Sequence, residues 1–311
     1  MSNRISKSNT IFKYGPLLIV LCMFLRATDV VFRSSTLSKI DPLELITLEH
    51  LIACIVLLRW IPSFRRILTF SAFEIFCVLF ISCGSSVGGI LFFTSAFQYI
   101  NPSVVILLQK LQPIVTIFLS YMILKERFPA KFWFWAAIGV GAGYVLGFGL
   151  SLPEVSFASQ NFRGVIFALI AMTLWGSGTV FGKKLVAKLD PGTVTRYRYF
   201  LGLFFALVLL FSLRSVGSLG ILTHPEALTN IVYMALVPGF LALALYYKGL
   251  QKTSASIASI LELAFPLFAV LFTWLFLKKP LSSHQLLAGA VLLLSVVMIS
   301  RIGMIPRASS P

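Results

Sequence analysis

Residues 254–277 read SASIASILELAFPLFAVLFTWLFL, a run of 24 residues in which Glu262 is the one charged side chain. A helix of about 20 mostly apolar residues spans the hydrocarbon layer of a membrane, so this run predicts a membrane-spanning helix. Residues 102–124, PSVVILLQKLQPIVTIFLSYMIL, have the same character and carry one charge, on Lys110. Both runs indicate that lipid, rather than water, surrounds the helices of this protein.

The composition extends this interpretation to the whole chain. Hydrophobic residues make up 58% of the 311 residues, charged residues make up 12%, and the mean hydropathy is +0.94. An ordinary soluble domain has about 25% charged residues, and it could not bury so much apolar surface. The net charge of +16 would favour nucleic acid as the partner of a soluble protein. Here the basic residues form short clusters between apolar runs, which indicates membrane topology and no nucleic-acid partner.

The apolar runs and their polar breaks predict an all-α membrane protein with ten transmembrane helices. The predicted spans are Gly15–Phe32, Leu43–Leu58, Phe73–Phe97, Pro102–Leu124, Phe132–Gly149, Gly164–Phe181, Gly192–Leu213, Leu228–Tyr247, Ser254–Leu277 and Ser283–Ile299. Cytoplasmic loops of membrane proteins are enriched in Lys and Arg. With the amino terminus inside, sixteen of the 26 basic residues fall in inner segments and six in outer segments. We therefore expect a multi-pass protein with both termini in the cytoplasm.

An internal repeat divides the chain into residues 1–150 and residues 151–311. A shift of 153 residues places Pro113 on Pro266, and it places Leu124-Lys125 on Leu277-Lys278. Each half then contains five predicted spans. Because five is odd, the second half enters the membrane with the opposite orientation. Inverted repeats recur in secondary transporters, whose substrate sites lie near the membrane midplane between the two halves.

Short motifs occur in both halves, most of them at matching places; the Trp-Gly motif of the second half is replaced in the first half by Leu25-Arg26-Ala27. The first half contains Leu108-Gln109-Lys110-Leu111-Gln112-Pro113 and Leu124-Lys125-Glu126-Arg127; the second contains Leu174-Trp175-Gly176-Ser177-Gly178, Leu261-Glu262-Leu263-Ala264-Phe265-Pro266 and Leu277-Lys278-Lys279-Pro280. In these motifs the chain resembles the EamA-like members of the drug/metabolite transporter superfamily, which have ten helices in two repeats. The resemblance extends over about residues 17–299. It implies a metabolite exporter or exchanger in the bacterial cytoplasmic membrane, which is the plasma membrane of the cell.

Charged residues inside the predicted spans are candidate substrate-binding residues. An ionisable group at the bilayer centre costs about 2.5–3.5 kcal/mol, so it usually faces a cavity or a partner. Lys110 lies near mid-depth, and we expect its ammonium to face a central cavity within reach of Asp29 or Glu49. Arg26 either neutralises Asp29 or faces the cavity, whereas Arg33 is expected to reach the outer interface. Glu49 either contacts substrate or a proton, or forms a structural pair with Lys110 or Arg26.

Uncharged polar and aromatic residues complete the candidate substrate site. Gln109 and Gln112 lie on one polar face of their span, and Glu262 takes the place of Gln109 in the second repeat. Trp175 and Tyr246 provide aromatic walls for an apolar or cationic substrate. An aromatic belt at the membrane interface is the alternative for these aromatic residues.

Prolines, arginines and glycines inside the spans predict local geometry. Pro113 and Pro266 remove backbone donors in mid-helix, so each is a candidate hinge; family geometry without a hinge function is the alternative. Arg196 and Arg198 lie near the inner surface and are interpreted as anchors to lipid headgroups. Glycines spaced four residues apart predict close helix packing, with a homodimer as an alternative.

Catalytic and cofactor motifs give little support to an enzyme. The chain contains no HExxH and no GxGxxG, and its one GxSxG, Gly84–Gly88, lies inside an apolar span. No metal, no cofactor and no ATP-driven step are expected. Both charge signs inside the spans favour a secondary active or facilitative transporter of a small polar or zwitterionic metabolite. The alternatives are a multidrug exporter of hydrophobic cations and, in another class, a membrane-embedded enzyme or lipid-handling scaffold.

Overall fold

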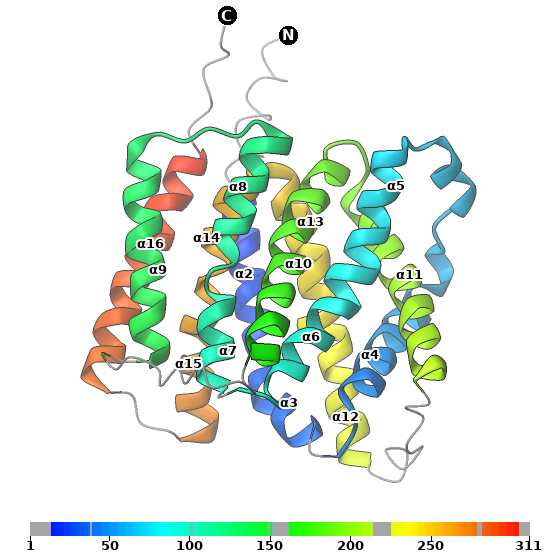
Figure 1. Cartoon of the computed structure of the whole chain (residues 1–311), viewed down its shortest axis with the longest axis horizontal. Helices are drawn as coiled ribbons and strands as arrows, with labels where there is room; N and C mark the ends of the chain where they lie inside the picture. The colour runs from blue at the N-terminus through cyan, green and yellow to red at the C-terminus, as the bar shows by residue number, and fades with distance from the viewer. Residues whose placement is uncertain are drawn as a thin grey trace, which may run out of the picture.

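The computed structural model describes residues 14–37, 39–100, 102–148, 150, 162–213, 225–278 and 282–304, and every regular element in these ranges is a helix (Figure 1). In chain order the α-helices are α2 (Gly15–Ala27), α3 (Val30–Leu37), α4 (Pro42–Leu57), α5 (Ala72–Leu79), α6 (Gly89–Ala96), α7 (Pro102–Gln109), α8 (Gln112–Leu124), α9 (Ala130–Phe148), α10 (Phe162–Val186), α11 (Pro191–Ser212), α12 (Pro225–Met234), α13 (Ala242–Lys252), α14 (Ala255–Leu261), α15 (Ala264–Leu277) and α16 (Ser283–Met304). Two π-helical segments, η3 (Phe80–Gly88) and η5 (Ala235–Leu241), join α5 to α6 and α12 to α13. Two short 3-10 helices, η1 (Leu58–Trp60) and η2 (Phe64–Thr69), lie between α4 and α5.

The predicted all-helical class is confirmed, and seven helical segments are long and apolar enough to cross a membrane. The remaining predicted spans correspond to shorter helices. Of these, α4 has 16 residues, and the apolar helices Gln112–Leu124 and Ala130–Leu146 each have 10–17 residues. The count of ten spans therefore stays a prediction.

Local sequence explains how several helices begin and end. Asp41 accepts a hydrogen bond from the first turn of α4, and Asp190 does the same for α11; a proline follows each aspartate. Such caps satisfy backbone N–H groups that have no partner within the helix. At the other end, Lys125 and Lys278 adopt left-handed backbone conformations, with φ of 54° and 51°, after α8 and α15. The two halves thus share start and stop signals.

The helices that carry Pro113 and Pro266 are both broken in the middle. The first is divided into α7 and α8 at residues 110–111, and the second into α14 and α15 at residues 262–263. Proline has no N–H to donate to the carbonyl four residues earlier, so Gln109 and Glu262 lose that bond. Two backbone hydrogen bonds correspond at the two breaks: the N–H groups of Lys110 and Glu262 each bond to the carbonyl four residues earlier, and those of Leu111 and Leu263 each bond to the carbonyl three residues earlier. A hinge function for the two prolines stays a prediction.

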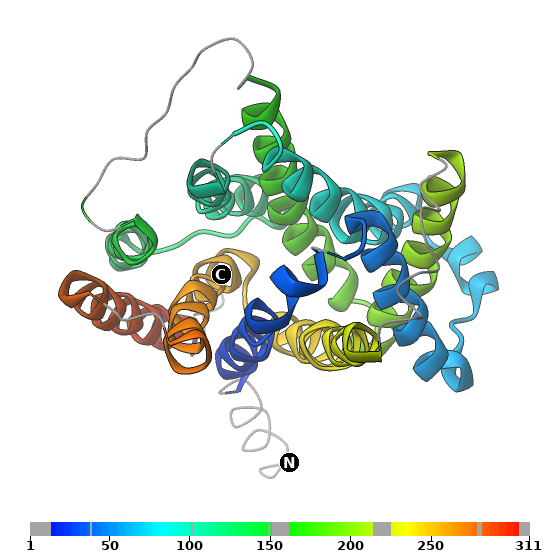
Figure 2. The same ribbon diagram turned by 90° about the horizontal axis from the view of Figure 1, so that it is seen from below.

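Helices pack against neighbours that correspond to those of their counterparts in the other half. Helix α2 packs against α13 and α15, and its counterpart α10 packs against α6 and α8. The pairs α4 with α11, α8 with α14 and α9 with α16 each join one half to the other. Figure 2 shows α2 in blue between α13 in yellow and α15 in orange. The centre of the molecule is therefore formed by both halves together.

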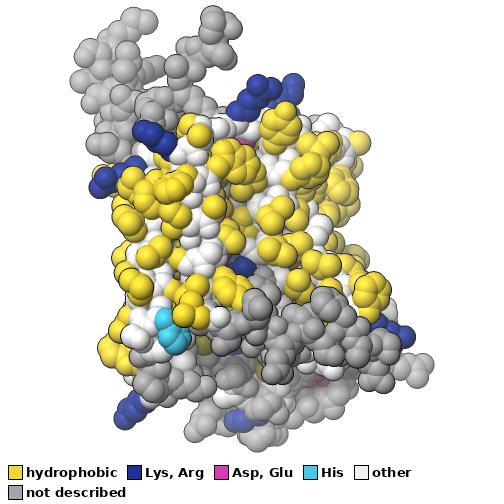
Figure 3. Space-filling model, turned by 60° about the vertical axis from the view of Figure 1, so that its left-hand side comes forward, with side chains coloured by type: hydrophobic (Ala, Val, Ile, Leu, Met, Phe, Trp, Pro, Cys, Tyr) yellow, Lys and Arg dark blue, Asp and Glu magenta, His cyan; other side chains and the backbone are white. Residues whose placement is uncertain are grey.

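The outer surface is largely apolar. Large side chains such as Phe118, Phe204 and Leu287 are 61%, 67% and 69% exposed, as expected of residues that face lipid. Figure 3 shows apolar side chains across the height of one face, with Lys and Arg mostly towards its two ends. Inside, the predicted close packing at glycines occurs in α10. A Cβ added at Gly182 would lie 2.9 Å from the ring of Tyr247.

Candidate functional site

Glu262 lies at the centre of a hydrogen-bonded group of side chains that we call the Glu262 cluster: Gln112, Thr179, Tyr246 and Glu262. The Tyr246 hydroxyl donates to Glu262 Oε1 at 2.6 Å, and the Thr179 hydroxyl lies 3.3 Å from the same oxygen. The Gln112 amide donates to Glu262 Oε2 at 2.9 Å. Three neutral donors therefore stabilise a carboxylate that would otherwise be expensive to bury.

The Glu262 cluster joins the two helix breaks directly. Gln112 is the first residue of α8, and Glu262 follows the last residue of α14. Their hydrogen bond connects residues 150 positions apart in the sequence. Thr179 from α10 and Tyr246 from α13 complete the group. A polar group is thus placed where broken helices from both halves meet, which is the kind of place where transporters bind substrate.

Trp175 lies one helical turn before Thr179 on α10. Its indole Nε1–H donates to the Ser85 carbonyl oxygen at 3.1 Å, and its ring centroid lies 5.2 Å from that of Phe93. The indole therefore joins α10 to η3 and α6. Because its polar atom is already bonded to protein, only its ring remains to contact a substrate next to the Glu262 cluster.

Arg198 belongs to a second polar group in the interior, which corrects its interpretation as a headgroup anchor. Its guanidinium donates to the Tyr247 hydroxyl at 3.0 Å and to the Ser86 hydroxyl at 3.3 Å. Ser86 also lies 2.9 Å from Nε2 of the buried His50. A guanidinium bonded to α13 and η3 faces the bundle and not the lipid headgroups. Its neighbour Arg196 instead donates to Thr193 on its own helix, at 2.7 Å.

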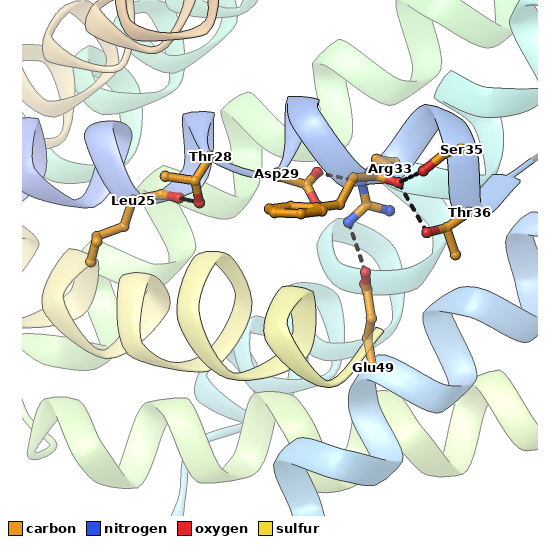
Figure 4. A network of polar contacts seen from close by, with 8 residues as sticks. Leu25, Thr28, Asp29, Arg33, Ser35, Thr36 and Glu49 are labelled. Carbon is orange, nitrogen blue, oxygen red and sulfur yellow. Dashed lines mark hydrogen bonds and ion pairs between the residues drawn. The ribbon is translucent and has the colours of Figure 1, made fainter. Parts of the chain in front are cut away.

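Asp29, Arg33 and Glu49 form an ion triad, shown in Figure 4. Arg33 bonds to the Asp29 carboxylate four residues earlier, and its Nη2 lies 2.8 Å from Glu49 Oε1 on α4. This arrangement corrects two expectations. Asp29 pairs with Arg33 and not with Arg26, and Glu49 has the same partner. One guanidinium at position i+4 can bond to two carboxylates at the same time, whereas two separate ion pairs would need two cations.

Lys110 is buried, with 8% of its surface exposed, and it lies at the break between α7 and α8. Its side chain forms no hydrogen bond or ion pair with any residue in the described ranges. The expected pair with Asp29 or Glu49 is wrong, because both carboxylates bind Arg33. Its nitrogen is not among the fully buried polar atoms without a partner, so the ammonium keeps some accessible surface.

Two other candidate residues lie near the Glu262 cluster without joining it. Arg26 on α2 is half-buried, and α2 packs against α13 and α14, which bring Tyr246 and Glu262 to the cluster. Gln109 is the last residue of α7 and is half-buried. Sequence reasoning missed Thr179, although its spacing of four residues from Trp175 places both on one face of α10.

Comparisons with known proteins agree with this architecture. A sequence model of the EamA-like transporter family matches the chain twice, at residues 13–148 and 162–301. The riboflavin transporter ImpX of Fusobacterium nucleatum is 27% identical over 295 residues, which cover 93% of this chain and 98% of that relative. Protein PecM of Dickeya dadantii is 29% identical over 220 residues, which cover 70% of this chain and 71% of PecM.

A solved crystal structure of a protein covers 93% of this chain and 97% of its own, with a TM-score of 0.72 and 18% sequence identity. This likeness supports the fold alone. The two family matches together extend over most of the residues of the chain, and they include both helix breaks. The chain is therefore a multi-pass membrane transporter rather than an enzyme, and it belongs to the EamA-like transporter family.

Proposed function

We propose that this protein is a secondary active or facilitative transporter, working as an exporter or exchanger of a small polar or zwitterionic metabolite. The observation that carries the proposal is the Glu262 cluster, which lies where two broken helices meet inside an apolar bundle. Its donors are neutral hydroxyls and an amide, which can exchange one hydrogen-bond partner for another at little cost. A polar substrate can therefore replace protein contacts there without leaving a charge unpaired.

The proposed architecture is ten spans in two inverted repeats, at residues 1–150 and 151–311. The two family matches, the paired helix breaks and the packing pattern that survives exchange of the halves support it. We place both termini in the cytoplasm of a bacterial cell and the protein in its cytoplasmic membrane, because basic residues gather in the segments that would then be internal. Labelling of single cysteines in inner and outer loops of intact cells would test this topology.

We assign the substrate-binding role to residues around the two breaks. Glu262, Gln112 and Tyr246 supply hydrogen-bonding groups, and Trp175 supplies an aromatic wall. Arg26 adds positive charge from α2, which packs against α13 and α14. Lys110 and Gln109 belong to the same break as Gln112. Asp29 and Glu49 are less favoured in this role than the sequence suggested, because Arg33 already bonds to both.

Riboflavin is the first substrate to test. The relative ImpX, which is similar over nearly its whole length, is named a riboflavin transporter. Riboflavin combines a flat ring system with a polar chain, and Trp175, Tyr246 and Tyr247 offer aromatic faces near polar groups. A hydrophobic cation is a weaker candidate, because the only carboxylate of the Glu262 cluster already has three donors.

Transport by purified protein in liposomes tests the proposal. Liposomes loaded with riboflavin, amino acids or nucleosides in turn should take up the same labelled compound by exchange for at least one of these substrates. Glu262→Gln removes the charge at constant size and should lower the exchange rate at least tenfold, about 1.4 kcal/mol. Lys248→Met, at an exposed position of α13, serves as the control. Exchange that is no faster than in empty liposomes for every compound would contradict the transport function.

A further inference from the structure

The two helix breaks are equivalent in the backbone and opposite in charge. Residues 110–111 interrupt the first helix and residues 262–263 interrupt the second, so Lys110 and Glu262 are each the first residue of a break, although the alignment of Pro113 with Pro266 pairs Glu262 with Gln109, one position before Lys110. Glu262 has three hydrogen-bond donors. Lys110 has no partner among the described residues, although 92% of its surface is buried. One half therefore presents a satisfied anion, and the other presents an unsatisfied cation.

The carboxylates that could neutralise Lys110 are bound elsewhere. Asp29 and Glu49 bond to Arg33, and Glu262 is held by its cluster. Glu126, just after α8, accepts hydrogen bonds from the first residues of α14 at 2.9 and 3.1 Å. A lysine that is buried without a counter-ion is costly, so its retention at this depth calls for an anion that is not part of these contacts.

The backbone at the α7–α8 break adds to the positive charge around Lys110. Lys110 lies two residues before Gln112, the first residue of α8, a helix of 13 residues whose amino terminus carries a partial positive charge. The carboxyl end of α7 carries a partial negative charge, which offsets part of this positive charge. A cation beside a helix amino terminus is unfavourable for the protein alone, whereas an anion there interacts with both the ammonium and the helix. Discontinuous helices of transporters bind anionic substrate groups in this way.

We propose that the α7–α8 break is an anion site and that the transported substrate carries a carboxylate or phosphate that binds Lys110. The substrate assignment rests on the proposed transport function, whereas the anion site does not. The hydrogen bond between Gln112 and Glu262 joins the two breaks. The polar remainder of such a substrate can therefore contact the Glu262 cluster while its anionic group binds Lys110. An anionic or zwitterionic metabolite fits this arrangement, and a hydrophobic cation does not. Riboflavin carries neither a carboxylate nor a phosphate, so exchange of riboflavin alone would contradict this substrate assignment while leaving the transport function in place.

Charged thiol reagents test the site without knowledge of the substrate. The four native cysteines are replaced by alanine, and Ile106→Cys places a thiol on α7 one turn before Lys110, where the Ile106 carbonyl accepts the Lys110 N–H at 3.2 Å. The rates of reaction with an anionic and a cationic methanethiosulfonate are compared in purified protein. We expect the anionic reagent to be favoured, and Lys110→Met to lower the ratio of rates about tenfold. Lys110→Arg should keep the ratio.

Protection then tests binding. Benzoate and inorganic phosphate should slow labelling of the thiol, and the neutral benzamide should not. The exposed Lys248→Met is the matched control, and it should change neither ratio nor protection. A ratio that Lys110→Met leaves unchanged, no reaction with either reagent, or no protection by either anion would overturn the site. If protection is found but liposomes show no exchange, the anion site stands and the transport function fails.

Discussion

The ion triad and the Glu262 cluster both bury carboxylates among apolar helices, but they stabilise them in different ways. In the triad, Arg33 bonds to Asp29 and Glu49, so charge meets charge. In the Glu262 cluster, two hydroxyls and an amide supply the hydrogen bonds. Removing one member of a buried ion pair destabilises the protein strongly, because the other charge is then buried without a partner. Neutral donors can exchange partners, which suits a site that a substrate must enter and leave.

The largest effect should come from breaking the triad. Arg33→Met leaves two carboxylates without their cation, and we expect a loss of about 3–5 kcal/mol in the stability of the folded protein. Thermal unfolding of the purified variant in detergent measures this loss. Arg33→Lys, which keeps the charge but not the two-sided geometry, should recover part of it. A melting temperature equal to that of the unmodified protein would show that the triad does not hold α3 to α4.

Lys110→Met should have the next largest effect, and it should act on transport instead of stability. Removing a buried cation without a partner should leave the melting temperature unchanged or raised, while exchange of an anionic or zwitterionic substrate falls about a hundredfold, or 2.7 kcal/mol. Proteoliposomes measure the rate, and membrane insertion is checked by the yield of folded protein. Normal exchange by Lys110→Met would assign Lys110 a structural role.

A matched pair of tyrosines gives the sharpest comparison with the smallest change. Tyr246 donates to Glu262, and Tyr233 on α12 donates to Thr28 at 2.9 Å, beside the triad. Tyr233→Phe loses one hydrogen bond, and Tyr246→Phe loses two, because the Tyr246 hydroxyl also lies 2.9 Å from the Thr179 hydroxyl. Each lost bond should lower the stability by about 0.5–1.5 kcal/mol. Only Tyr246→Phe should also slow substrate exchange. Equal exchange rates in both variants would indicate that the Glu262 cluster is structural.

The charged residues show which parts of the site could be predicted from the sequence and which could not. The sequence placed Glu262, Gln112 and Tyr246 among the candidates, and the structure brings these three together. It did not predict that Arg33 would bond to Asp29, because Arg26 and Arg33 lie at comparable spacing from that residue. Between them, the chain turns at residues 28–29, where the Thr28 hydroxyl donates to the Leu25 carbonyl at 2.7 Å. That interruption directs the two arginines to different neighbours.

By itself, the sequence determined where this chain forms apolar helices, where prolines break two of them and where caps repeat in the second half. Hydropathy and backbone chemistry act within a few residues, so local patterns are sufficient for these features. Only the tertiary structure decided which buried charges are satisfied. Glu49 lies 16 residues from Arg33, Glu262 lies 150 residues from Gln112, and the partners of Arg198 lie 112 and 49 residues away. Contacts over such separations depend on how helices from both halves pack, which the spacing of residues along one helix does not specify.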